Sequence, residues 1–139
     1  MKKIITLTLI IAALAVTFSS CNKEKQLEKR IEGTWNIDKA DGIVTPIGGG
    51  AGQTFSFPNI GTFTFKSDGT GTSSTNFGGG SQNSTFNWTN TETTVTITES
   101  GKTPSVMTVT TNEKTKQIWT STESDATSST TYTYTLSKK

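Results

Sequence analysis

Histidine is absent from this chain of 139 residues, and cysteine occurs once, as Cys21. Without histidine the chain lacks the usual general base, the partner that activates a catalytic serine and the commonest metal ligand. A single cysteine cannot close an intrachain disulfide or complete a thiolate zinc site. These absences argue against an enzyme, and we predict neither a cofactor nor a bound metal.

Acidic residues and glycines do not supply the missing chemistry. Asp38 and Asp41 are three residues apart, which puts them on opposite faces of a strand and makes them poor acid–base partners. Asp68 is not followed by further acidic residues at alternating positions, so we expect a hairpin turn there rather than a calcium loop. The glycine-rich segment 48–53 lacks the Gly-Lys-Ser/Thr ending of a phosphate-binding loop and is interpreted as a flexible loop.

Charge is scarce and balanced. The chain has 13 basic and 11 acidic residues, and two of the basic ones, Lys2 and Lys3, belong to the N-terminal leader described next. The remainder is therefore close to neutral and has no basic field that would attract a phosphate backbone. We predict no nucleic-acid partner.

Long hydrophobic runs are confined to the N-terminus. Residues 4–18 are apolar except for three threonines, follow the basic start Met1-Lys2-Lys3 and precede small residues. Such a helix would span only about 22 Å, less than the roughly 30 Å hydrocarbon core of a bilayer. The pattern is typical of a secretory signal peptide.

The end of this run, Phe18-Ser19-Ser20-Cys21, resembles a bacterial lipobox. The resemblance implies cleavage before Cys21 and acylation of that residue, so that lipid anchors the protein to a membrane of the cell envelope. Asn22 differs from the aspartate that retains some lipoproteins in the inner membrane, which by this resemblance favours the outer membrane. The predicted organisation is a signal peptide (1–20), a lipidated tether (21–30) and one folded domain (31–139). An ordinary cleaved signal or an uncleaved anchor is the alternative.

Composition after residue 20 favours β structure. Threonine occurs 27 times there, whereas leucine occurs only as Leu27 and Leu136. Threonine and aromatic residues favour strands, and a chain poor in leucine and alanine forms few helices. Leu27 and Ile31 are four residues apart, which suits one short helical turn lying on the domain. A solvated spacer is the alternative for residues 22–26.

Apolar and polar residues alternate in short runs separated by turn residues, which is typical of half-buried antiparallel strands. We predict an all-β, eight-stranded antiparallel up-and-down barrel. The expected strands are 34–40, 61–66, 70–77, 84–90, 93–99, 104–112, 115–123 and 128–136. Three interpretations remain for residues 41–60: a lid over one end of the barrel, an extra edge strand at 53–57, or a flexible linker.

Gly33-Thr34-Trp35, at the start of the first expected strand, resembles the Gly-x-Trp motif of lipocalins. Together with the lipobox and the run from Phe63 to Thr72, it makes the chain similar to the small lipocalin-like lipoproteins of Bacteroidota. The resemblance implies a calycin-type barrel with Trp35 plugging the closed end. Lipocalins usually stack an arginine from near the last strand on this tryptophan. Here only Lys138 and Lys139 lie near the C-terminus, so we expect a less secure closure.

Seven aromatic side chains are expected on the inner face of the barrel, where a small hydrophobic ligand would bind: Trp35, Phe63, Phe65, Phe86, Trp88, Tyr132 and Tyr134. An eight-stranded barrel either holds one small ligand or is filled by its own side chains. The alternative function is therefore a packed barrel that serves as a protein-interaction or structural module. Trp119 next to Ile118 breaks the alternation, so one of the two is expected to face outward, and an exposed Trp119 would suit a partner surface.

Overall fold

The computed structural model describes residues 23–77 and 79–139, which form one short helix followed by eight strands. The predicted leader and the lipidation residue Cys21 lie outside the described residues. The helix covers residues 23–31. The strands are β1 (Gly33–Pro46), β2 (Gln53–Phe65), β3 (Thr70–Thr75), β4 (Gln82–Asn90), β5 (Thr94–Glu99), β6 (Ser105–Asn112), β7 (Lys116–Ser124) and β8 (Ser128–Lys138).

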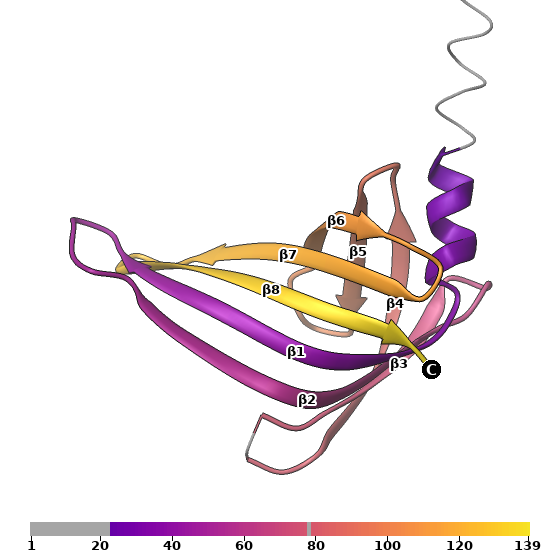
Figure 1. The fold of residues 1–139 in the computed structure, drawn as a ribbon, viewed down its shortest axis with the longest axis horizontal. Helices are drawn as coiled ribbons and strands as arrows, with labels where there is room; N and C mark the ends of the chain where they lie inside the picture. Colours follow the sequence, from indigo (N-terminus) through magenta and orange to yellow (C-terminus); the bar gives the residue numbers. More distant parts are fainter. Residues whose placement is uncertain (1–22, 78) are drawn as a thin grey trace, which may run out of the picture.

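Each strand pairs antiparallel with the next along the chain, and β8 pairs with β1, so the sheet closes into a barrel (Figure 1). This confirms the predicted eight-stranded up-and-down fold. In such a meander the connections alternate between the two ends of the barrel. The β2–β3, β4–β5 and β6–β7 turns share one end with the helix, and the other connections lie at the opposite end.

The helix closes its end of the barrel. Leu27 and Ile31 are fully buried, as their spacing predicted, and the helix also includes residues 23–26 of the segment for which a solvated spacer was the alternative. Polar contacts hold the helix on the turns beneath it. The Lys23 ammonium lies 2.9 Å from the Glu92 carboxylate, and the Asn90 side-chain amide donates to the carbonyl of Glu24 (2.9 Å).

Three tryptophans fill the barrel next to the helix. Trp35 and Trp119 have no exposed surface, and Trp88 is nearly as buried. Each indole N–H has an acceptor: Trp35 donates to the carbonyl of Ile31 (2.7 Å), Trp88 to that of Lys66 (3.0 Å), and Trp119 to the side chain of Gln117 (3.2 Å). The three indole rings are therefore buried without leaving an unpaired N–H group, which would cost free energy.

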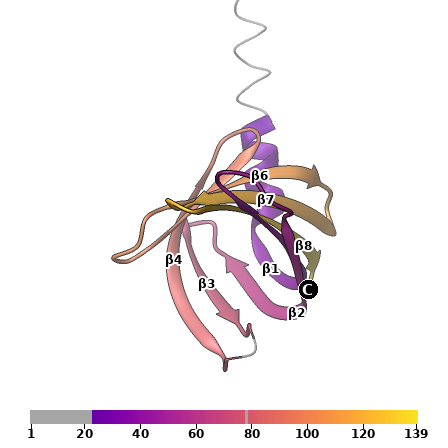
Figure 2. The same ribbon diagram turned by 90° about the vertical axis from the view of Figure 1, so that its left-hand side faces the viewer.

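Beyond the opposite end, β1, β2, β7 and β8 continue past the other strands (Figure 1). This four-stranded extension consists of residues 38–46, 53–60, 120–124 and 128–135 in the order β2–β1–β8–β7. Figure 2 views the molecule from the tip of the extension. The lid and the flexible linker predicted for residues 41–60 are both wrong. Residues 53–57 are indeed strand, but they belong to β2 and pair with β1 rather than forming an extra element.

The extension begins where both strands of the first hairpin are irregular. The β1 register shifts between Ile37 and Lys39 in both of its ladders. In β2, Asn59 has a φ of 51° and Gly61 one of 143°, and a Cβ on Gly61 would lie 1.9 Å from the backbone oxygen of Ser74. Only glycine fits this close approach of β3 at a positive φ. The bulge and the glycine therefore allow the hairpin to leave the barrel wall.

Candidate functional site: the open end of the barrel

A cavity of about 350 Å³ opens at the end of the barrel opposite the helix. Its apolar lining comes from β1, β2, β5 and β6, with Phe77 contributed by the β3–β4 connection. The polar lining comes from the end of β3, the start of β4, and the residues around the β5–β6 connection. The main apolar side chains are Ile37, Ile60, Phe63, Phe77, Ile97 and Met107.

Two of the seven aromatic residues predicted to bind a ligand line this cavity. Phe63 contributes from β2 and Tyr134 from β8. Tyr132 lies next to them, its ring stacked on that of Tyr134 at a centroid distance of 6.2 Å. These three are the predicted residues that the fold brings to the open end.

The other four predicted residues, Trp35, Phe65, Phe86 and Trp88, pack inside the core instead of lining the cavity. Phe65 lies 5.3 Å from Phe86 and 5.4 Å from Trp88, measured between ring centroids. Their inward orientation was predicted, but their level along the barrel axis was not. Gly71 pairs with both Phe65 and Phe86, and a Cβ there would lie 2.2 Å from the Phe86 ring, so the absent side chain makes room for this packing.

One of the pair Ile118 and Trp119 faces outward, as the interrupted alternation predicted, but it is Ile118, so Trp119 offers no partner surface. Its ring is fully buried, stacked on Phe63 at 6.3 Å, whereas Ile118 is partly exposed. The register of β6 against β7 shifts between Val109 and Thr111, and this bulge accompanies the interrupted alternation. Gln117 also points inward, where its amide donates to the Asn112 side chain (2.8 Å).

Lys138 closes the helix end of the barrel. Its ammonium lies 4.5 Å from the centroid of the Trp35 ring and donates to the carbonyls of Arg30 (3.3 Å) and Glu32. A lysine therefore stands over Trp35, where the resemblance implied an arginine. Desolvation lowers the pKa of Lys138, and the nearby Glu32 carboxylate opposes that shift. The guanidinium of Arg30 donates to the carbonyl of Asn112 and so holds the helix on the β6–β7 turn.

Tyr134 is a titratable group lining the cavity whose pKa shifts strongly. Burial raises its pKa from 10.0 to about 12, and the charges of Tyr132 and Glu123 add to the effect. The hydroxyl is therefore protonated over the whole physiological range. It presents a neutral polar group to the cavity.

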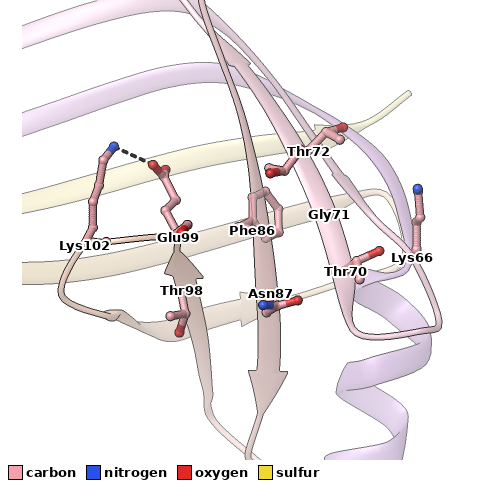
Figure 3. A pocket seen from close by; sticks show the side chains of 12 residues that line it. Lys66, Thr70, Gly71, Thr72, Phe86, Asn87, Thr98, Glu99 and Lys102 are labelled. Carbon is pink, nitrogen blue, oxygen red and sulfur yellow. Dashed lines mark hydrogen bonds and ion pairs between the residues drawn. The ribbon is translucent and has the colours of Figure 1, made fainter.

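A second hollow of about 500 Å³ lies on the outer surface of β3, β4 and β5 (Figure 3). Thr70, Thr72 and Asn87 line it, and Glu99 and Lys102 stand at its border. Figure 3 shows the ion pair of Glu99 and Lys102, with 2.5 Å between the ammonium nitrogen and the carboxylate oxygen. The same two residues also line the cavity, so the pair stands between the cavity and this outer hollow.

The part of the chain that the structure describes contains no group of acidic residues or cysteines arranged to hold a metal ion. Within residues 23–77 and 79–139, no helix has the length and hydrophobicity needed to cross a bilayer. The open end offers an apolar cavity with polar groups at its border. Such an arrangement can bind a small molecule.

The protein is therefore of the class of closed up-and-down β-barrels with eight antiparallel strands. Its barrel is plugged at one end and hollow at the other. The sequence model of the lipocalin-like domain family matches residues 31–119, which is more than half of the chain. The chain belongs to the lipocalin-like domain family. No curated protein and no solved structure matches it.

Proposed function

We propose that this protein is a lipid-anchored protein of the cell envelope, without enzymatic activity, whose barrel binds a small hydrophobic or amphipathic molecule at its open end. The observation that carries the binding function is the cavity of about 350 Å³ with apolar walls. Pockets that hold small molecules usually have volumes of roughly 300–1,000 Å³. Removing apolar ligand surface from water contributes about 25 cal/mol per Å².

The position of the helix supports a defined orientation on the membrane. Cys21 precedes the first described residue, Lys23, by two residues, a distance of at most about 8 Å along the chain. Lys23 itself is held against Glu92 at the closed end. Lipid on Cys21 would therefore hold the closed end at the membrane and leave the cavity on the side away from it. We place the anchor in the outer membrane on the resemblance of residues 18–22 to a lipoprotein signal.

The neutral fluorescent probe N-phenyl-1-naphthylamine tests the binding function. Every strand and every core residue named above lies within residues 23–139, so a chain that begins at residue 22 contains the whole barrel. The probe should gain fluorescence in its presence. Met107→Trp fills the cavity and should weaken binding about tenfold or more, equivalent to ~1.4 kcal/mol or more. Circular dichroism would verify that the variant retains the barrel.

Val106→Trp is the matched control. Val106 is adjacent to Met107 but lies on the outer face of β6, with 55% of its surface exposed. This variant should bind the probe as the unaltered chain does. Equal loss in both variants, or no fluorescence gain at all with a folded barrel, would contradict binding in the cavity.

Labelling of growing cells with an alkyne fatty acid tests the anchor. The unaltered chain should carry the label and remain in the outer-membrane fraction, while Cys21→Ser should carry none. An unlabelled wild-type protein would rule out lipidation at this position. The result does not depend on whether the cavity binds a ligand.

The packed protein-interaction module remains the second candidate function. The dense aromatic core favours it, because four of the seven predicted ligand residues are occupied in packing. Photo-crosslinking from Val106 or Ile43, both exposed, would capture a defined protein partner in this case. A barrel that binds no probe but crosslinks reproducibly to one protein would favour this second function.

A further inference from the structure

Five aromatic rings form a continuous arc along one side of the cavity mouth. Between ring centroids, Tyr134 lies 6.2 Å from Tyr132, Tyr132 lies 5.8 Å from Phe55, and Phe55 lies 5.5 Å from Phe57. Phe57 lies 5.8 Å from Phe77. Tyr134 and Phe77, the two ends of this aromatic arc, both line the cavity. The arc therefore extends the apolar surface of the cavity outward onto the four-stranded extension.

The register of the extension explains why the rings share one face. Ala40 of β1 is opposite Phe57 on one side and Tyr134 on the other. Two residues further on, Gly42 is opposite Phe55 and Tyr132. Residues directly opposite each other in an antiparallel sheet project from the same face. A Cβ on Gly42 would lie 1.9 Å from the Phe55 ring, so that ring lies across the bare backbone of β1.

The opposite side of the mouth is polar. Amide and hydroxyl groups come from Gln82, Asn83 and Ser105. The only charged side chains lining the cavity are Glu99 and Lys102, which form an ion pair with each other. An anion bound near Lys102 would be attracted by its ammonium and repelled by the Glu99 carboxylate. A cation would be attracted by Glu99 and repelled by Lys102. For either charge the two interactions largely cancel.

We infer that the mouth selects an amphipathic molecule whose polar head is uncharged, with hydroxyl or amide groups, and whose apolar part runs from the cavity onto the aromatic arc. The cavity is near the lower limit of ligand pockets, so an elongated apolar part needs the surface that the arc provides. An uncharged head keeps hydrogen bonds to the polar side without the cost of desolvating an ion. This inference rests on the proposed binding function and specifies its ligand class.

Three probes with the same alkyl chain and different heads test the choice of head: dodecyl maltoside, dodecanoate and dodecyltrimethylammonium, each below its micelle concentration. Displacement of N-phenyl-1-naphthylamine measures the affinity of each. We expect dodecyl maltoside to bind about tenfold more tightly than either ion, equivalent to ~1.4 kcal/mol. Equal affinities, or tighter binding of one ion, would overturn the selection while leaving the binding function intact. Failure of the naphthylamine probe itself would instead overturn the binding function.

Two charge-neutralising variants sharpen the test. Glu99→Gln leaves the Lys102 ammonium unpaired and should improve dodecanoate binding several-fold, whereas Lys102→Gln should do the same for dodecyltrimethylammonium. In each variant the readout is the affinity for the ion relative to the affinity for dodecyl maltoside. The inference would be overturned if the unaltered chain bound dodecanoate more tightly than dodecyl maltoside and Lys102→Gln lost that binding. Lys102 would then be an anion contact.

The aromatic arc has its own test. Phe55→Ser and Phe57→Ser remove partly exposed rings outside the barrel core, so the fold should survive. Each substitution should weaken the binding of dodecyl maltoside more than the binding of the shorter octyl maltoside, because only the longer alkyl chain reaches the arc. A loss that is equal for both chain lengths, or absent for both, would contradict the assignment of the apolar part to this surface.

Discussion

The two ends of the barrel are built from the same alternating strands, yet one is filled and the other is hollow. At the helix end, Trp35, Trp88 and Trp119 occupy the cross-section, and Leu27 and Ile31 cover them. At the mouth, β1, β2, β7 and β8 leave the cylinder and continue as the extension. Side chains that would otherwise meet across the barrel diverge there. Inward orientation alone therefore does not tell a packing residue from a lining residue.

Polar contacts fix the closed end. Lys138, Arg30 and Gln117 all reach backbone or side-chain acceptors there, and each indole N–H is paired. The mouth instead carries its aromatic rings partly exposed, with 38% of Phe57 and 49% of Phe77 accessible. Exposed apolar surface of this kind supports the proposed binding function. Under that proposal, stability and binding are separated along the barrel axis, which the following predictions test.

The largest effect is expected from Trp119→Ala at the closed side of the core. Removing a fully buried tryptophan should cost about 3–5 kcal/mol, because transferred apolar surface is lost and a void remains. Urea unfolding followed by circular dichroism measures the loss. Val106→Ala on the outer face serves as the control and should change stability by less than about 0.5 kcal/mol. Similar losses in the two variants would contradict a core centred on Trp119.

Gly61→Ala should break the junction between the barrel and the extension. The added Cβ would lie 1.9 Å from a backbone oxygen at a φ of 143°, so β3 must shift. We expect a destabilisation of about 1–3 kcal/mol. Gly79→Ala, where a Cβ meets nothing within 4 Å, is the matched control in the same denaturation experiment. A neutral Gly61→Ala would mean that the strands part without this close approach.

The mouth should give the protein a specific loss of stability at high pH. The pKa of Tyr134 is raised to about 12 in the folded state, from 10.0 for an exposed tyrosine. Between these two values the unfolded chain loses the Tyr134 proton while the folded chain keeps it. The contribution of Tyr134 to the free energy of unfolding is therefore complete below pH 10 and falls by on the order of 2 kcal/mol as the pH rises toward 12. Unfolding free energies measured across this range should fall less steeply for Tyr134→Phe. Identical slopes in the two chains would exclude a buried hydroxyl at the mouth.

The smallest of these effects is expected at the closure of the helix end. Lys138→Met keeps an apolar side chain of similar length but removes the ammonium over Trp35 and its hydrogen bonds to two carbonyls. A loss of about 1–2 kcal/mol should follow, while Lys138→Arg should retain most of the stability. Probe binding at the mouth should not change in either variant. Reduced probe affinity in a folded Lys138→Met would show that the two ends are coupled.

Alternation predicted much of the fold because every second side chain of a strand faces inward, so the pattern itself identifies the inner face. It placed Phe63 and Tyr134 correctly on the inner face, and it gave the number and order of the strands. It did not reveal that Phe55 and Phe57 continue β2. Pro58 and Gly61 interrupt the pattern there, and turn residues follow Pro46, so the hairpin resembled a long connection. Phe55 and Phe57, two residues apart, supported an edge strand at 53–57 as one interpretation, but no local pattern showed that it continues β2.

The sequence alone determined the period, the turns, the Gly-x-Trp entry and the shortage of catalytic groups, because these depend on residues close together in the chain. Tertiary structure decided where along the barrel axis each ring lies and which strands extend beyond their neighbours. It also decided that the Lys138 ammonium lies over the Trp35 ring. Those outcomes depend on register between strands and on single-residue bulges. A shift of one residue there moves a side chain to the other face, and local patterns do not record it.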